Sequence, residues 1–145
     1  MEDFQKILKK NKYKKINFKV SKTQHLLIKA SINGVKGSFI LDTGASNSCL
    51  GFESIEKFQL QTEHSKTKAA GAGATGMFTQ LAKNNSIQLG KWKEKKLHLV
   101  IFDLSHVNTA LTQYKAKPVD GIIGADVLLK GKAIIDYYNH CLYLR

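Results

Sequence analysis

Apolar and polar residues alternate along several short stretches of the chain, and this period of two predicts β-strands. The alternation is clearest where Ile16, Phe18 and Val20 share one face. The pair Asn33-Gly34 predicts a tight hairpin turn, because both positions of such a turn need a positive φ. The strands predicted are 13–20, 25–32, 35–41, 86–89, 97–102, 119–123, 133–138 and 141–144.

Helical spacing is confined to short segments. Phe4, Ile7 and Leu8 share one side of a helix predicted at 2–10. The glycine-rich stretch 69–76 cannot pack into a core, so a mobile loop or hairpin tip is expected there. Many short strands with little helix favour an all-β barrel or sandwich. Further short helices are predicted at 51–58, at 124–129 and, in part, at 104–114.

The size and composition fit one ordinary globular domain. The chain has 145 residues, of which 43% are hydrophobic, so disorder and fibrous repeats are excluded. No apolar run reaches the roughly 18 to 20 residues that span a bilayer. The first residues carry no apolar segment behind their charges, which predicts no secretory signal. With only two cysteines, Cys49 and Cys141, a reducing, cytoplasmic location is expected.

The charge is strongly positive. There are 23 Lys and Arg against 11 Asp and Glu, for a formal net charge of +12. Such a field attracts polyanions and acidic surfaces. Arg145 is the only arginine, however, and base reading relies on the bidentate arginine fork. We therefore expect no specific nucleic-acid recognition, only sequence-blind attraction to phosphates.

The segment that indicates chemistry is Phe39-Ile-Leu-Asp-Thr-Gly-Ala-Ser46. An aspartate at the end of a buried strand is costly unless its charge is satisfied. The amides of Gly44 and Ala45 can donate to the Asp42 carboxylate, and the Thr43 hydroxyl can hold the loop. By itself, such an aspartate also suits a simple loop cap.

A second segment, Val119-Asp-Gly-Ile-Ile-Gly-Ala-Asp-Val-Leu128, predicts a buried strand that turns directly into a helix. Gly124 would allow this turn to cross tightly beneath the Asp42 loop.

These two segments, with the glycine-rich stretch between them, resemble the retropepsin-type aspartic peptidases over residues 24–145. The resemblance implies a mainly β, retropepsin-like acid protease barrel with one or two short helices, as a single domain at 24–145. Residues 1–23 are then a basic N-terminal segment, a helix plus a strand, docked on that domain.

The resemblance also implies an aspartic endopeptidase that acts on peptides or proteins without metal or cofactor. Such enzymes use two carboxylates that share one proton. This chain has a single Asp-Thr-Gly, so the second carboxylate must come from a second copy, in a homodimer. Asp42 is then catalytic; Thr43, Gly44, Ala45 and Ser46 support it; and Gly71, Ala72, Gly73 and Gly76 form the tip of a substrate-binding flap.

The sequence departs from the retroviral pattern at a paired position. Many retroviral members have an acidic residue where this chain has Ser46 and an arginine where it has Ala125, so their ion pair is absent here. Asp126 is expected to hydrogen-bond near Ser46 instead. The N-terminal segment and extra residues before Pro118 make the chain more similar to cellular or bacterial members.

Two other functions stay open at this point. The chain could be a dimeric peptide-binding module that keeps the fold but cleaves little. It could also be a polyanion-binding protein, which predicts salt-dependent affinity independent of Asp42. Cys49 is expected to be a buried small hydrophobe rather than a nucleophile. The five histidines show no metal-ligand spacing, so no metal site is expected.

Overall fold

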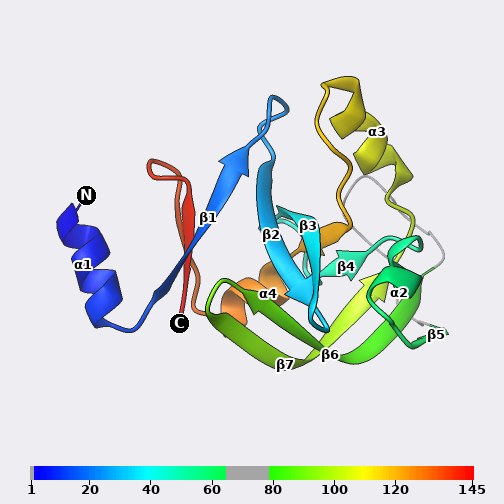
Figure 1. Cartoon of the computed structure of the whole chain (residues 1–145), viewed down its shortest axis with the longest axis horizontal. Helices are drawn as coiled ribbons and strands as arrows, with labels where there is room; N and C mark the ends of the chain where they lie inside the picture. The colour runs from blue at the N-terminus through cyan, green and yellow to red at the C-terminus, as the bar shows by residue number, and fades with distance from the viewer. Residues whose placement is uncertain (1, 65–78) are drawn as a thin grey trace.

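The computed structural model describes residues 2–64 and 79–145 (Figure 1). In these residues the fold is mainly β. The helices are α1 (Glu2–Lys10), α2 (Ser54–Lys57), α3 (Ser105–Gln113) and α4 (Ala125–Lys130). The strands are β1 (Lys14–Val20), β2 (Leu26–Ile32), β3 (Val35–Leu41), β4 (Cys49–Leu50), β5 (Thr62–His64), β6 (Gln80–Leu89), β7 (Trp92–Ile101), β8 (Gly121–Ile123), β9 (Ile134–Asp136) and β10 (Cys141–Leu144).

Six of the strands close into a barrel. They follow the order β6-β7-β4-β8-β3-β2, and a further pairing of β2 with β6 completes the ring. Closure removes free strand edges from this part of the sheet. Alternate residues of β2, such as Ile28 and Ile32, point into the interior and join the main hydrophobic core. The predicted barrel is therefore confirmed.

The β2–β3 hairpin forms where the sequence predicts it. Ile32 pairs with Val35, which leaves Asn33 and Gly34 as the two turn residues. Their φ angles are 51° and 82°, the left-handed values that a two-residue turn of this kind requires.

The β6–β7 hairpin is longer than predicted. Its register shifts between Ala82 and Ile87, and Asn84 has a φ of 60°, so the strand is irregular there. Because of this irregularity and the polar run at 83–86, the alternation of apolar and polar residues cannot be seen in this part of the sequence.

Strand β4 is not predicted from the sequence, because two residues are too few to show an alternation of apolar and polar positions. It forms by pairing with both β7 and β8.

The N-terminal segment continues the sheet. Strand β1 pairs with β10 along one part and with β2 along another. Helix α1 projects beyond β1 (Figure 1) and buries Leu8 against Cys141 and Tyr143. The division of the chain at residue 23 stays a prediction.

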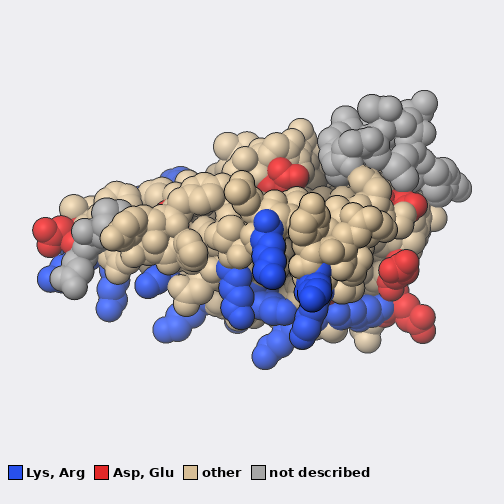
Figure 2. Space-filling view, turned by 90° about the horizontal axis from the view of Figure 1, so that it is seen from above, with Lys and Arg blue, Asp and Glu red and all other residues tan. Residues whose placement is uncertain are grey.

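Charges are unevenly spread over the surface. Figure 2 shows Lys and Arg gathered along one side of the molecule, with Asp and Glu mostly towards its two ends. Within 2–64 and 79–145 three lysines form ion pairs, as Lys57–Asp120, Lys83–Glu63 and Lys130–Glu94. Most lysines of the described chain therefore keep an uncompensated charge. No helix in these ranges is long and apolar enough to span a membrane.

The turn between β9 and β10 makes stability depend on pH. The Asn139 side chain and main-chain N–H donate to the Asp136 carboxylate at 2.8 and 3.0 Å, and these bonds lower the pKa of Asp136. A carboxyl group with a lowered pKa in the folded state stabilises the fold at neutral pH. That contribution is lost as the pH falls below about 4, through the folded-state pKa.

We therefore expect Asp136→Asn to be less stable than the unsubstituted protein near neutral pH, with the difference shrinking in acid. Urea unfolding of both proteins at about pH 7 and about pH 3 measures this. A difference that does not change with pH would show that the carboxylate charge has no part in the effect.

Candidate active site

The Asp42 loop follows the last residue of β3. Strand β3 runs parallel to β8, and the Asp42 N–H continues this pairing by donating to the Ile123 carbonyl at 2.9 Å. The Gly44 N–H donates to Asp42 Oδ1 at 2.9 Å, as the sequence predicts. The Ala45 N–H instead donates to the Asp42 main-chain carbonyl at 3.2 Å. The prediction that it donates to the Asp42 carboxylate is therefore wrong. One oxygen of the carboxylate is thus held in place by the loop itself.

Gly124 allows the strand-to-helix turn to cross closely under this loop. A Cβ at residue 124 would lie 2.5 Å from the Ala45 main-chain oxygen, closer than any side chain can approach. The same oxygen accepts a hydrogen bond from the Ala125 N–H at 2.7 Å. The predicted tight crossing is confirmed, and it ties the loop to the start of α4.

Asp126 braces the loop through Ser48, which lies two residues after Ser46 and so near the predicted place. Its Oδ1 accepts from the Ser48 hydroxyl at 2.7 Å and its Oδ2 from the Ser48 N–H at 2.9 Å. The Gly124 N–H in turn donates to the Ser48 hydroxyl oxygen at 3.0 Å. The hydrogen bond expected near Ser46 forms at Ser48 because Ser46 is exposed, whereas Ser48 is buried directly before β4. The only feature of the sequence that pointed to Ser48 is that this serine lies six residues after Asp42.

The predicted site residues 42–46 are all at least partly accessible to solvent. Asp42 and Ala45 are half-buried, while Thr43, Gly44 and Ser46 are exposed. No residue of 2–64 or 79–145 donates to Asp42 Oδ2, so this oxygen is available to a molecule outside the described chain. The four predicted flap residues, Gly71, Ala72, Gly73 and Gly76, lie outside the described residues.

Cys49 lies just beyond the loop and is not suited to nucleophilic chemistry. Its side chain is buried, and burial raises the pKa of its thiol to about 12. The Asp126 and Asp42 carboxylates raise it further, against the hydrogen bond from Ile122. Because the thiolate is the reactive form, the thiol is inert at neutral pH.

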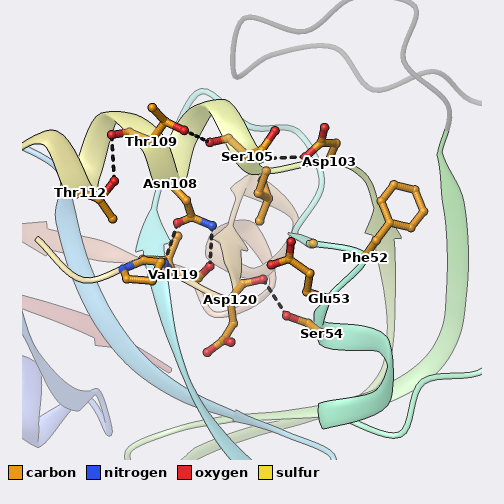
Figure 3. Close-up of a pocket in the computed structure, with 13 residues that line it drawn as sticks. Phe52, Glu53, Ser54, Asp103, Ser105, Asn108, Thr109, Thr112, Val119 and Asp120 are labelled. Atoms are coloured by element: carbon orange, nitrogen blue, oxygen red, sulfur yellow. Dashed lines mark hydrogen bonds between the residues drawn. The ribbon is translucent and has the colours of Figure 1, made fainter.

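A pocket of about 420 Å³ lies between α2, α3 and the segment before β8 (Figure 3). Asn108 of α3 holds this segment, since it accepts from the Val119 N–H at 2.7 Å and donates to the Val119 carbonyl at 3.2 Å. Helix α3, which precedes Pro118, is thus fixed to the segment that leads into β8, the strand that supports Asp42. The pocket lining does not include Asp42.

Comparison with known proteins places this arrangement in a family. A family model described as aspartyl protease matches residues 28–127. A retropepsin-like aspartic protease from Rickettsia conorii has a similar structure, with a TM-score of 0.63, 22% identity, and 91% of this chain and 90% of that chain covered. No curated protein matches the sequence.

Two further solved structures share the fold. The retroviral protease-like domain of Ddi1 from Leishmania major has a TM-score of 0.56 and 18% identity, covering 87% of this chain and 90% of that one. The EIAV protease, in complex with the inhibitor HBY-793, has a TM-score of 0.53 and 21% identity, covering 71% and 84%. At these identities the likeness shows the retropepsin-like fold alone. Because the family model covers well over half of the sequence, the chain belongs to the aspartyl protease family.

Proposed function

We propose that this chain is an aspartic endopeptidase that works as a homodimer, with Asp42 of each subunit in one active site. The observation that carries the proposal is the Asp42 carboxylate at the end of β3. Gly44 holds its Oδ1, and Oδ2 receives no bond from the described residues. A single such loop provides half of a two-carboxylate site. The surrounding residues Thr43, Gly44, Ala45 and Ser46 shape and hold the loop.

The chemistry follows from two carboxylates about 3 Å apart, which cannot both ionise and so share one proton. The ionised carboxylate takes a proton from a bound water, whose oxygen attacks the peptide carbonyl carbon. The protonated carboxylate donates a hydrogen bond to the carbonyl oxygen and stabilises the developing negative charge. The nitrogen of the scissile bond then accepts a proton as the C–N bond breaks. The pair titrates as a unit rather than as two separate groups.

The homodimer is supported by what a lone chain lacks. The only Asp-Thr-Gly is at 42–44, and the other aspartates in the predicted strands and turns have no such flanks. Thr43 is exposed and has no hydrogen-bonding partner within the described ranges, so its hydroxyl is free to bond across a two-fold axis. Gly71, Ala72, Gly73 and Gly76 are proposed to form the tip of a flap over the bound peptide. We place the activity in the cytoplasm because both cysteines are free and buried.

Mixing active and inactive subunits tests the shared site. We expect a ninefold excess of the Asp42→Asn protein to lower the activity of wild-type subunits about tenfold, since mass action leaves roughly one in ten of them paired with another wild-type subunit. The measurement is the initial rate of peptide cleavage after equilibration of the mixture.

Excess protein alone must not cause this loss. Ninefold bovine serum albumin serves as the control, and light scattering gives the oligomeric state at each concentration. If activity stays unchanged in the mixture, or if a strictly monomeric species is fully active, the hypothesis that two subunits share one active site is rejected.

A further inference from the structure

A lysine-lined groove lies on the outer face of the barrel, apart from the Asp42 loop. Its volume is about 670 Å³. No acidic side chain contributes to its lining. The charged and polar residues that line it are Lys29, Lys36, Lys57, Ser31, Ser38 and Gln88.

The strand register explains why these side chains gather. Lys29 of β2 pairs with Ser38 of β3, and Ser31 pairs with both Lys36 and Gln88 of the flanking strands. Directly paired residues point to the same side of a sheet, and here that side is away from the core. The sheet therefore presents a continuous patch of cationic and neutral donors.

Of the three lysines that line the groove, Lys29 and Lys36 carry a positive charge that no described acidic residue compensates. The third, Lys57, is compensated because it binds both carboxylate oxygens of Asp120, at 3.1 and 3.0 Å. Lys29 donates to the Ser38 hydroxyl at 2.6 Å and has no ion pair within 2–64 and 79–145. Lys36 is exposed and has neither a hydrogen bond nor an ion pair in the same ranges. The groove is therefore suited to an anionic ligand.

The groove and Asp42 lie towards opposite ends of β3. Lys36 and Ser38 are near the start of the strand, and Asp42 follows its last residue. Ile40, which lies between them on the same side of the strand, is buried in a second hydrophobic cluster, so this covered stretch separates the groove from Asp42. At about 3.3 Å per residue, the lysine end of the groove lies roughly 13 to 20 Å from Asp42. An extended peptide needs at least about four to six residues to bridge this distance.

We propose that this groove binds an acidic segment of a protein substrate and so recruits that substrate to the active site. The inference rests on the proposed proteolytic function. Nucleic acid is a poorer fit, because the lining contains no aromatic side chain for base stacking and no arginine. A carboxylate-rich segment needs only the exposed ammonium, hydroxyl and amide donors that the groove supplies.

The first test measures binding without cleavage. A fluorescent Glu-rich peptide is titrated into Asp42→Asn protein, and its anisotropy is followed at fixed salt. We expect Lys29→Glu with Lys36→Glu to weaken binding roughly tenfold, because two attractive charges become repulsive. The matched control, Lys9→Glu with Lys10→Glu on α1, changes net charge equally and is expected to weaken binding by less than about threefold. Lys29→Gln with Lys36→Gln, which removes charge with less disturbance, is expected to give an intermediate loss.

The second test measures recruitment. Two substrates share one cleavable sequence, and one of them carries a Glu-rich extension on a flexible linker of about ten residues. We expect the extension to lower KM about tenfold without changing kcat in the wild-type chain. This gain should vanish in the Lys29→Glu, Lys36→Glu protein, while cleavage of the plain substrate is unchanged.

The outcomes separate this inference from the proposed function. If the α1 control loses as much peptide affinity as the groove variant, the peptide is attracted to the net charge of the protein, and the proposal that it binds in the groove is wrong. Tighter, groove-dependent binding of an oligonucleotide of equal charge would overturn the acidic-peptide assignment. Cleavage with no benefit from the extension rejects recruitment and leaves the protease intact. Groove-dependent peptide binding without any cleavage supports the groove and rejects the protease.

Discussion

Replacement of Asp42 by asparagine is expected to lower peptide turnover by about 10²- to 10⁴-fold, the usual contribution of acid–base groups. Asparagine has nearly the shape of aspartate and can still accept from the Gly44 N–H, which lies 2.9 Å from Oδ1. It cannot take up or release a proton. In a homodimer the one substitution removes both carboxylates of the dyad. Initial rates over a broad peptide library at pH 4–7 measure the loss.

Asp103→Asn is the matched control for this experiment. Asp103 is exposed, and its carboxylate bonds the Ser105 N–H at 2.8 Å at the start of α3, away from the loop. Its substitution is expected to leave turnover within about twofold. Turnover that survives in Asp42→Asn would make the catalytic assignment wrong. If the unsubstituted chain binds library peptides but cleaves none, the peptide-binding alternative gains instead.

Substitution of Gly124 by alanine is expected to lower the free energy of unfolding by about 3 kcal/mol, at the upper end of overpacking costs. The new methyl carbon would lie 2.5 Å from the Ala45 main-chain oxygen. Backbone cannot move aside as the end of a flexible side chain can. The strain therefore falls on the loop that carries Asp42, and turnover should drop together with stability. Urea unfolding and initial rates on the same preparation measure both.

Gly51→Ala separates this clash from the general effect of a methyl group. Gly51 is also buried, but a Cβ there would meet Leu104 at 3.5 Å, an ordinary van der Waals distance. Its substitution is expected to change stability by less than about 1 kcal/mol, because alanine also restricts the unfolded chain. Equal losses in the two proteins would show that the crossing beneath the loop is not the cause.

Local patterns were sufficient for much of the fold and for the centre of the site. The alternation in β1, β2 and β3 and the Asn33-Gly34 turn depend on neighbours in sequence, so they could be predicted without tertiary contacts. The same is true of the aspartate at the end of β3, whose Gly44 N–H lies only two residues away.

Elements that form through partners distant in sequence were missed or misplaced. Strand β4 is two residues long and exists because β7 and β8 lie on either side of it. The polar run at 83–86 in β6 is held by Asn33 of the β2–β3 turn, which exchanges hydrogen bonds with Ser86 and donates to the Asn85 side chain. The sequence predicts an Asp126 hydrogen bond near Ser46, but only burial decides that the partner is Ser48, 78 residues away in sequence.

A β-rich chain with one aspartate loop of the protease type can be predicted from the amino-acid order, because strand period, turn residues and the Asp42-Thr43-Gly44 motif are local properties. The bracing of that loop by Ser48, Asp126 and the crossing at Gly124, and the set of lysines that share a groove, emerge on folding. Hydrogen bonds and charge clusters across a closed barrel depend on strand register. Register is set by the packing of the whole core and is not visible in any one segment.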